Sequence, residues 1–442
     1  MIVRILQPMI AFSGNAPPQL AVTRQLVERG HEVRVLAHRA TRARIERTGA
    51  EFVEFRHAFP EMDLTRRETD TLRDWEPRTF IGTGRRLLEN ALFAFVGDVA
   101  IDCFERLAQW PADVVVFDWM LIGAAIAAER AGLPAVTLVH CPYTLPVVGA
   151  PPMGLGLRPM PGGVGATRDR VLRGLISRYV ASMGDRVVRE ARAEQGLAPL
   201  SRWEDQLLGV QAIYMMTAPE LDFASRGALP SNVHYVGPAF EPFEQAWRSP
   251  WPDTNGDPLV VISFSTSYMN QVALVQRVLD AVEGLQVRAL LTTGPALEAD
   301  RLRVPANTHV SAFVAHRSVF PHASLVVTHA GWQTINAALA DGVPLVCVPD
   351  GRDQPDNAAR VLVAGAGVRV SKRASARKLR AAIVGALRDP GLKEAAHAMS
   401  VALARSDGAL EVAEAIERIH ARAAWVGARD VLASAMLGAP GR

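Results

Sequence analysis

Short runs of apolar, often β-branched residues recur along the chain, and each is followed by a longer segment with apolar residues at helical spacing. The runs cover residues 2–6, 32–36, 113–117 and 135–139 in the first half, and 259–264, 287–291, 325–328 and 345–348 in the second. Strand and helix patterns that alternate in this way are typical of parallel strands joined by crossover helices. Because the runs are almost entirely apolar, we expect these strands to be buried on both faces.

The strand pattern starts again at residue 259, which predicts two doubly wound α/β domains that face a cleft. We expect an N-terminal domain over residues 1–238, a linker rich in Pro, Trp and Asp over residues 239–258, and a C-terminal domain over residues 259–400. Residues 401–442 are expected to form a helical segment that packs back on the N-terminal domain. Ligands of such folds bind beyond the carboxyl ends of the strands, so the chemistry is expected on the loops that follow strands.

Composition and charge narrow the class of protein. The 442 residues are 49% hydrophobic and 21% charged, and 48 basic against 45 acidic side chains leave a net charge of +3. Charge this balanced argues against a nucleic acid or an anionic membrane as partner, and no apolar run reaches the roughly 18 residues of a membrane span. Cys103, Cys141 and Cys347 lie far apart without metal-site spacing, which favours a cytoplasmic protein without disulfides or zinc.

A strand-to-helix corner in the second half is the clearest candidate site. A buried strand is followed by His329-Ala330-Gly331, and residues 332–340 have a helix-forming pattern. The free N–H groups and the positive dipole end of that helix would suit a diphosphate. Gly331 permits close approach of a ligand, Thr334 offers a hydroxyl, and His329 can donate a hydrogen bond. An ordinary corner with a capping Thr and a structural His accounts for the same spacing about as well.

A polar pair and two long loops complete the candidate cleft. Asp353 and Gln354 follow the strand at 345–348, and a carboxylate beside an amide is suited to hydrogen-bonding vicinal sugar hydroxyls. A solvated polar loop is the plainer interpretation of that pair. Residues 56–84 and 141–165 interrupt the alternation, and their Met, Pro and aromatic side chains would suit an apolar ligand, although surface loops explain either stretch alone.

These residues together resemble the donor-site signature of the inverting UDP-glycosyltransferase superfamily, in particular the bacterial natural-product and macrolide glycosyltransferases of the GT-B fold. The pattern in that family reads roughly H-[AG]-G-x-[GN]-T and then P-x-x-x-DQ-x-x-NA. This sequence supplies His329, Ala330, Gly331, Thr334, Pro349, Asp353, Gln354, Asn357 and Ala358. Gln333 stands where the family usually has Gly or Asn, which changes the local phosphate geometry.

The resemblance also implies which residues would hold a UDP- or dTDP-sugar. Ser265, Thr266 and the backbone from Trp332 onward would contact the phosphates, Phe313 would stack on the base, and Val314 would offer its backbone. The helix N-terminus, His329 and Thr266 would stabilise the negative charge of the departing diphosphate, so neither a metal nor another cofactor is expected.

The catalytic residues of the family match this chain less well. The His of the family's GH-x-x-P segment is the general base, and Asn15 occupies its position within residues 14–18. An amide does not titrate near neutral pH and cannot serve as a base. The Asp that orients that His in the family matches Asp118, which follows a buried strand, although capping the next helix would equally explain Asp118.

Three hypotheses for activation of the nucleophile therefore stay open. In the first, Asp118 acts as the base while Asn15 orients the acceptor. In the second, His140, at the end of the strand at 135–139, replaces the missing His. In the third, the acceptor is reactive enough to need little base catalysis. The acceptor is expected to be an apolar small molecule. Its contacts would come from Trp75, Phe80, Met120, Tyr143 and Met153.

The sequence thus predicts an inverting glycosyltransferase of natural-product biosynthesis with an atypical base site. Two alternatives belong to other classes: a catalytically impaired sugar-nucleotide-binding helper of the same fold, and a GT-B-fold sugar-nucleotide epimerase. The intact donor residues argue against the helper. The sequence leaves open the sugar, the nucleotide, the acceptor and the linkage, as well as the oligomeric state, for which a homodimer is one option.

Overall fold

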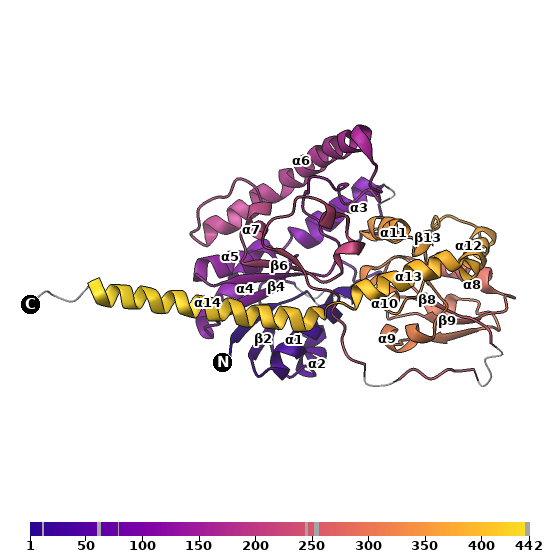
Figure 1. Cartoon of the computed structure of the whole chain (residues 1–442), viewed down its shortest axis with the longest axis horizontal. Helices are drawn as coiled ribbons and strands as arrows, with labels where there is room; N and C mark the ends of the chain where they lie inside the picture. The colour runs from indigo at the N-terminus through magenta and orange to yellow at the C-terminus, as the bar shows by residue number, and fades with distance from the viewer. Residues whose placement is uncertain (11–12, 60–62, 78, 244–245, 252–255, 438–442) are drawn as a thin grey trace, which may run out of the picture.

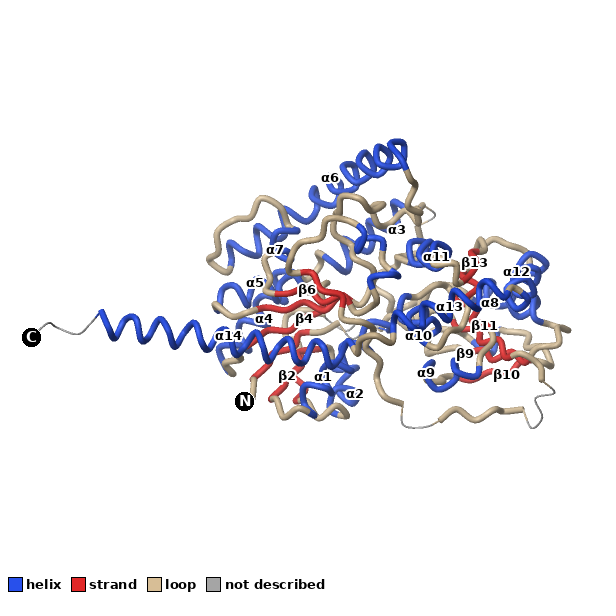
Figure 2. The backbone as a smooth tube through the Cα atoms, in the orientation of Figure 1, coloured by secondary structure: helices blue, strands red, loops and turns tan. Residues whose placement is uncertain are grey.

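The strands form two separate parallel sheets, one in each of two lobes that lie side by side (Figure 1). The structure, a computed structural model, describes residues 1–442 except 11–12, 60–62, 78, 244–245, 252–255 and 438–442. Figure 2 shows the strands of each lobe enclosed by helices. Among the described residues, no helix is long and apolar enough to cross a bilayer.

The N-terminal lobe contains a seven-stranded sheet in the order β3-β2-β1-β4-β5-β6-β7. Its strands are β1 (Arg4–Pro8), β2 (Glu32–Ala37), β3 (Glu51–Glu54), β4 (Val114–Asp118), β5 (Ala135–Val139), β6 (Ala212–Met215) and β7 (Val233–Tyr235). One face is covered by α1 (Ala16–Glu28), α2 (Arg42–Glu46) and α14 (Gly408–Leu437). The other is covered by α4 (Val96–Gln109), α5 (Ile122–Ala131), α6 (Gly162–Glu194) and α7 (Glu204–Leu208).

The crossing of α4 and α5 requires a glycine. A Cβ atom at Gly123 would lie 2.2 Å from the carbonyl oxygen of Val96, a separation that no pair of these atoms can adopt. The missing side chain therefore lets α5 approach the backbone of α4 closely. This contact fixes α5, and with it the loop from β4 that carries Asp118.

The C-terminal lobe contains a six-stranded sheet in the order β10-β9-β8-β11-β12-β13. Its strands are β8 (Leu259–Ser263), β9 (Arg288–Thr292), β10 (Thr308–Ser311), β11 (Leu325–Thr328), β12 (Leu345–Cys347) and β13 (Gly367–Arg369). One face is covered by α8 (Val272–Val282) and α12 (Ala376–Arg388). The other is covered by α9 (His316–Val319), α10 (Trp332–Ala340), α11 (Gln354–Val363) and α13 (Pro390–Leu403).

All eight strands predicted from apolar runs are present, with small shifts at their ends. β1 extends to Pro8 rather than stopping at residue 6, because the buried amide of Gln7 accepts a hydrogen bond from Thr23 inside the lobe and the ladder with β2 continues. The apolar runs did not predict β3, β6, β7, β10 and β13. Four of these missed strands carry half-buried or exposed positions, so their hydrophobic signal is weak.

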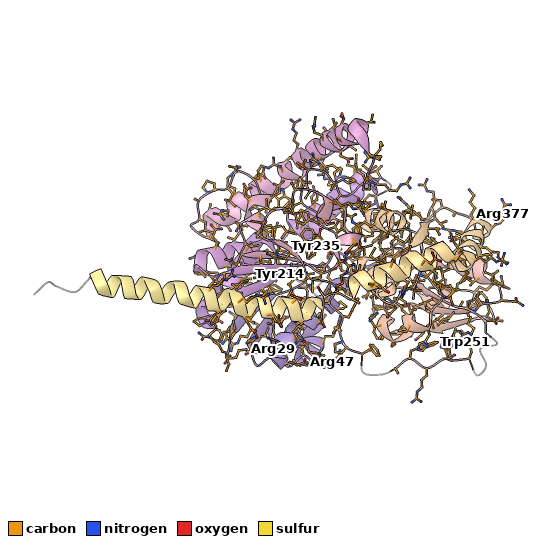
Figure 3. The ribbon with its side chains drawn as sticks, viewed as in Figure 1. Arg29, Arg47, Tyr214, Tyr235, Trp251 and Arg377 are labelled. Carbon is orange, nitrogen blue, oxygen red and sulfur yellow. The ribbon has the colours of Figure 1, made fainter. Side chains whose placement is uncertain are left out.

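The C-terminal helix α14 lies along α1 of the N-terminal lobe. Val412 and Ile416 are fully buried against that lobe. At the edge of this contact, Arg29 pairs with Glu417 at 2.8 Å, and Figure 3 shows the labelled Arg29 beside α14. The second sheet begins at β8, after the expected linker, but the boundaries at residues 238 and 258 stay predictions.

Candidate active site

The corner between β11 and α10 leaves its backbone N–H groups available to a ligand. Gly331 is the N-cap of α10 and no side chain caps the helix. Among the described residues, the N–H groups of Trp332 and Gln333 and the hydroxyl of Thr334 have no hydrogen-bond acceptor. Ala330 holds a left-handed backbone conformation with φ of 72°. A strained residue of this kind at a helix N-terminus is typical of functional corners.

His329 folds over this corner and is neutral near pH 7. Its ring stacks on Phe264 with the centroids 6.1 Å apart, and a Cβ atom at Gly331 would lie 2.8 Å from its Nε2 atom. Burial and, to a lesser extent, the charge of Arg352 lower the pKa of His329 to about 4. Because its Nδ1 atom lies 3.5 Å from the hydroxyl of Thr328, Nε2 is the nitrogen that the imidazole can offer a phosphate.

The loop between β12 and α11 is tied to the same corner. Asn357 Nδ2 donates to Asp353 Oδ2 at 2.8 Å and to the carbonyl oxygen of Ala330 at 3.0 Å. Burial raises the pKa of the Asp353 carboxyl. Gln354 is 2% exposed, and its side-chain oxygen accepts from the N–H groups of Asp350 and Gly351, at 2.9 and 3.1 Å. Asp353 is therefore the more available of the two expected sugar contacts.

The other expected donor residues follow β8 and β10 at the same sheet edge. Phe313 is 81% exposed, so one aromatic face is free for stacking. Thr266 is exposed, Val314 is half-buried, and Ser265 is buried with its hydroxyl 3.1 Å from that of Ser267. All of these residues lie on loops after strand ends, as the sequence predicted.

Asp118 is fully buried at the end of β4 and is saturated with hydrogen-bond donors. Its Oδ2 atom accepts from Gln19 Nε2 at 2.7 Å and lies 3.0 Å from His140 Nε2. Its Oδ1 atom accepts from the backbone N–H of Met120 at 3.0 Å. Asp118 therefore orients its neighbours but presents no free oxygen to the cleft.

His140 connects this carboxylate to the C-terminal lobe. It is 5% exposed, and among the described residues its Nδ1 atom has no hydrogen-bond partner. Gln333, the residue that departs from the family pattern, donates from Nε2 to the His140 carbonyl oxygen at 3.1 Å. His140 thus contacts both Asp118 and the first turn of α10, where the diphosphate of the donor is expected.

Asn15 and Met120 lie at the rim of the same region. Asn15 is the N-cap of α1, but its side chain makes no capping hydrogen bond and instead lies 3.9 Å from Met120 Sδ. Both residues are half-buried. A side chain at position 15 can therefore be exchanged without losing a cap.

The expected acceptor residues do not all come together. Tyr143 and Met153 line one small cavity of about 40 Å³. Trp75 lies elsewhere: its indole N–H donates to Asp70 at 2.7 Å, and its ring packs edge-on against Tyr268 of the other lobe, with centroids 5.2 Å apart. The side chain of Phe80 lies outside the described residues.

A larger cavity of about 630 Å³ opens where loops of both lobes meet beyond β12 and β13. Its charged lining comes from Arg158, Asp350, Arg352, Arg369 and Lys372. None of these residues was predicted from the sequence to have a role, and neither was Gln19, whereas Asn357 was part of the donor-site motif. One signal in the sequence pointed to Gln19, because it lies one helical turn after Asn15 on a face that is mostly apolar.

Comparisons with known proteins decide the family. The family described as UDP-glucoronosyl and UDP-glucosyl transferase matches residues 304–408, which include the His329 corner and the Asp353 loop. The 4'-demethylrebeccamycin synthase of Lentzea aerocolonigenes is 30% identical, over 94% of this chain and 99% of that relative. The chain belongs to the UDP-glycosyltransferase family. It is a glycosyltransferase of the natural-product type, as its motifs predicted.

A more distant relative is also similar over most of the chain, and solved structures share its fold. The demethyllactenocin mycarosyltransferase of Streptomyces fradiae is 23% identical, over 94% of this chain and 86% of that relative. The kitacinnamycin glycosyltransferase structure superposes with a TM-score of 0.74 at 20% identity, covering 95% of this chain and 99% of its own. VinC in complex with dTDP gives 0.69 at 18% identity, covering 95% and 100%. This UDP-glycosyltransferase therefore has the predicted GT-B fold of two Rossmann-like domains.

Proposed function

We propose that this glycosyltransferase transfers a sugar from a UDP- or dTDP-sugar to an apolar small molecule with inversion at the anomeric carbon, and that His140 is its general base. The observation that carries the proposal is the 3.0 Å contact between His140 Nε2 and Asp118 Oδ2 beside the uncapped start of α10. The pair supplies an imidazole and an orienting carboxylate in a chain whose family base position holds Asn15.

The reaction divides between the two lobes. The acceptor oxygen attacks the anomeric carbon from the face opposite the diphosphate, the bond from that carbon to the phosphate oxygen breaks, and the acceptor proton passes to His140. The departing charge falls on the diphosphate, where the N–H groups at the start of α10 and the hydroxyl of Thr334 can stabilise it. Asp118 stabilises the imidazolium that forms. The proposal needs no metal in any step.

His140 is favoured over Asp118 as the base for a geometric reason. Both oxygens of Asp118 already accept hydrogen bonds and its side chain is fully buried, so an acceptor hydroxyl cannot reach it without breaking one of them. Asn15, half-buried and without a cap bond, would orient the acceptor at the rim. The exposed face of Phe313 supports stacking on the base of the nucleotide.

A screen of UDP- and dTDP-sugars against phenolic, polyketide and amine acceptors tests the proposal by mass spectrometry. The expected product is one acceptor plus one sugar, with the anomeric proton coupling in its NMR spectrum showing the configuration opposite to that of the donor. Retained configuration would rule out the inverting mechanism. Nucleotide-sugar binding without transfer or donor hydrolysis would support the helper protein instead.

A further inference from the structure

One loop of the N-terminal lobe, residues 63–76, crosses onto the C-terminal lobe beside the donor site. The backbone N–H of Tyr268 donates to the carbonyl oxygen of Leu64 at 2.7 Å, and the ring of Trp75 packs edge-on against that of Tyr268. Tyr268 follows Ser265 and Thr266 on the loop after β8. This N-terminal loop therefore touches the same edge of the second sheet that carries the expected phosphate contacts.

The centre of this contact is a buried ion pair between Asp74 and Arg352. Arg352 Nε lies 2.6 Å from Asp74 Oδ2, and its Nη2 atom lies 3.0 Å from Asp74 Oδ1, so the pair is bidentate. The third guanidinium nitrogen, Nη1, donates a hydrogen bond to Ser267 Oγ at 2.7 Å. The carboxylate side chain is fully buried and the guanidinium side chain is 19% exposed. Such a pair is rigid, and removing one partner leaves an uncompensated charge.

Arg352 has a backbone conformation that it would not adopt unaided. Its φ of 54° lies in the left-handed region, which is unfavourable for a residue with a Cβ atom. The next residue is Asp353, the expected sugar contact, and the preceding N–H groups of Asp350 and Gly351 are bound by Gln354. The loop 350–353 is therefore fixed at both ends, and Asp74 holds the strained residue in between.

We propose that Asp74 and Arg352 are positioning residues for the transferred sugar. Their ion pair holds the loop 350–353 in the conformation that presents the Asp353 carboxylate, so recognition of the sugar depends on a residue of the opposite lobe. The inference rests on the proposed function, because it assigns Asp353 to the sugar of a nucleotide donor. The nucleotide itself is held by other elements, namely the loops after β8 and β10 and the start of α10. The pair should therefore affect the sugar and spare the nucleoside diphosphate.

Calorimetric titration of the full chain tests this separation. The probes are UDP, UDP-glucose, dTDP and dTDP-glucose, and the measured quantity is the dissociation constant of each nucleoside diphosphate divided by that of its sugar-bearing form. In Asp74→Asn we expect this ratio to fall about tenfold, within the range of coupling between contacting groups, while the nucleoside diphosphate binds within about threefold of wild type. Arg352→Gly, which accepts the positive φ but has no guanidinium, should lower the ratio equally. The double variant should lower the ratio no further than either single variant does.

A second buried ion pair between the lobes provides the matched control. Asp222 Oδ1 lies 2.9 Å from Arg360 Nη2, and both side chains are buried. Asp222→Asn should lower the melting temperature without changing the ratio. An equal fall of the ratio in that variant would assign the effect to lobe association in general and overturn the positioning role.

The remaining outcomes separate this inference from the proposed function. Wild-type protein that binds neither UDP nor dTDP would remove both. If nucleotide binding is intact but the ratio is unchanged in Asp74→Asn and Arg352→Gly, the positioning role alone is overturned. The same holds if wild-type protein binds the sugar-bearing form no more tightly than the nucleoside diphosphate. Should Asp74→Asn fail to fold, Arg352→Lys, which keeps the charge and loses the fork, is expected to show the same fall.

Discussion

The two lobes assemble their functional residues in different ways. In the C-terminal lobe the expected donor contacts come from short stretches that directly follow strands, and a single corner, His329-Ala330-Gly331, provides the phosphate end. In the N-terminal lobe the proposed base is built from side chains far apart in the sequence: Asp118 and His140 meet across two strands, and Gln19 reaches them from a helix. The donor site is thus local in sequence, whereas the base site depends on the register of a sheet.

The largest expected effect tests the N-terminal half of this comparison. His140→Ala should lower kcat about 10²–10⁴-fold, because general base catalysis contributes that much, while the affinity for UDP or dTDP stays unchanged. Steady-state kinetics with the acceptor found in the screen provides the measurement.

A second substitution in the same background sharpens the result. Asn15→His, added to His140→Ala, should restore part of kcat. Position 15 makes no capping hydrogen bond that the change would break, and the side-chain amide of Gln19 already links the backbone of residue 15 to Asp118. Unchanged turnover in His140→Ala would assign the proton to solvent or to an acidic acceptor.

The next largest effect concerns a contact between the two lobes, whose contribution to stability depends on pH. Asp356 of α11 accepts hydrogen bonds from the N–H groups of Gly154 and Gly156 in the N-terminal lobe, at 2.9 and 3.1 Å. Burial raises the pKa of Asp356 from 3.8 to about 6, so the folded protein favours the neutral acid. Its contribution to stability is therefore fully present below about pH 4 and is lost as the pH rises through about 6.

Asp356→Asn removes this dependence, because the amide stays neutral. From pH 4 to pH 7 the unfolding free energy of wild type should fall by about 2 kcal/mol relative to that of the variant. Urea denaturation at several pH values measures the difference. A constant difference between the two proteins would show that the carboxyl titrates normally in the folded state.

Gly331→Ala tests the corner at the start of α10 by adding an atom rather than removing one. The new Cβ atom would lie 2.8 Å from Nε2 of His329 and must displace the ring from the start of α10. Overpacking of this kind costs about 1–3 kcal/mol, so the affinity for UDP or dTDP should fall by about 5- to 150-fold. Gly385→Ala is the matched control, since a Cβ atom at Gly385 meets open space. Equal affinities in both variants would place the diphosphate elsewhere.

The comparison also explains what the sequence could predict. The corner was predictable because buried strand, turn glycine and helix start follow one another within a few residues. The contact of Asp118 with His140 follows from the parallel register, which pairs Asp118 with Leu138 and so puts residue 140 on the same face, two positions further along. The sequence of neither strand alone predicts that register, because the register depends on how the two strands pair. The position of Trp75 was beyond prediction, since its partner, Tyr268, belongs to the other sheet.

The smallest expected effect concerns Gln333, which joins the two kinds of site. Its side chain begins in the first turn of α10 and donates to the carbonyl oxygen of His140, so it ties the phosphate corner to the end of β5. Gln333→Asn restores a residue usual in the family, but its shorter side chain cannot span the same 3.1 Å contact from an unchanged backbone. Loss of one such hydrogen bond costs about 0.5–1.5 kcal/mol, so kcat should fall about 2- to 12-fold.

The affinity for the nucleoside diphosphate separates two explanations of that loss. If Gln333 acts only by holding His140 against the donor, UDP and dTDP should bind Gln333→Asn as they bind wild type, and the deficit should disappear in the His140→Ala background, where no base remains to be aligned. A deficit that persists without His140 would instead show that the amide serves the phosphate corner itself, and the base site would then be independent of the donor lobe.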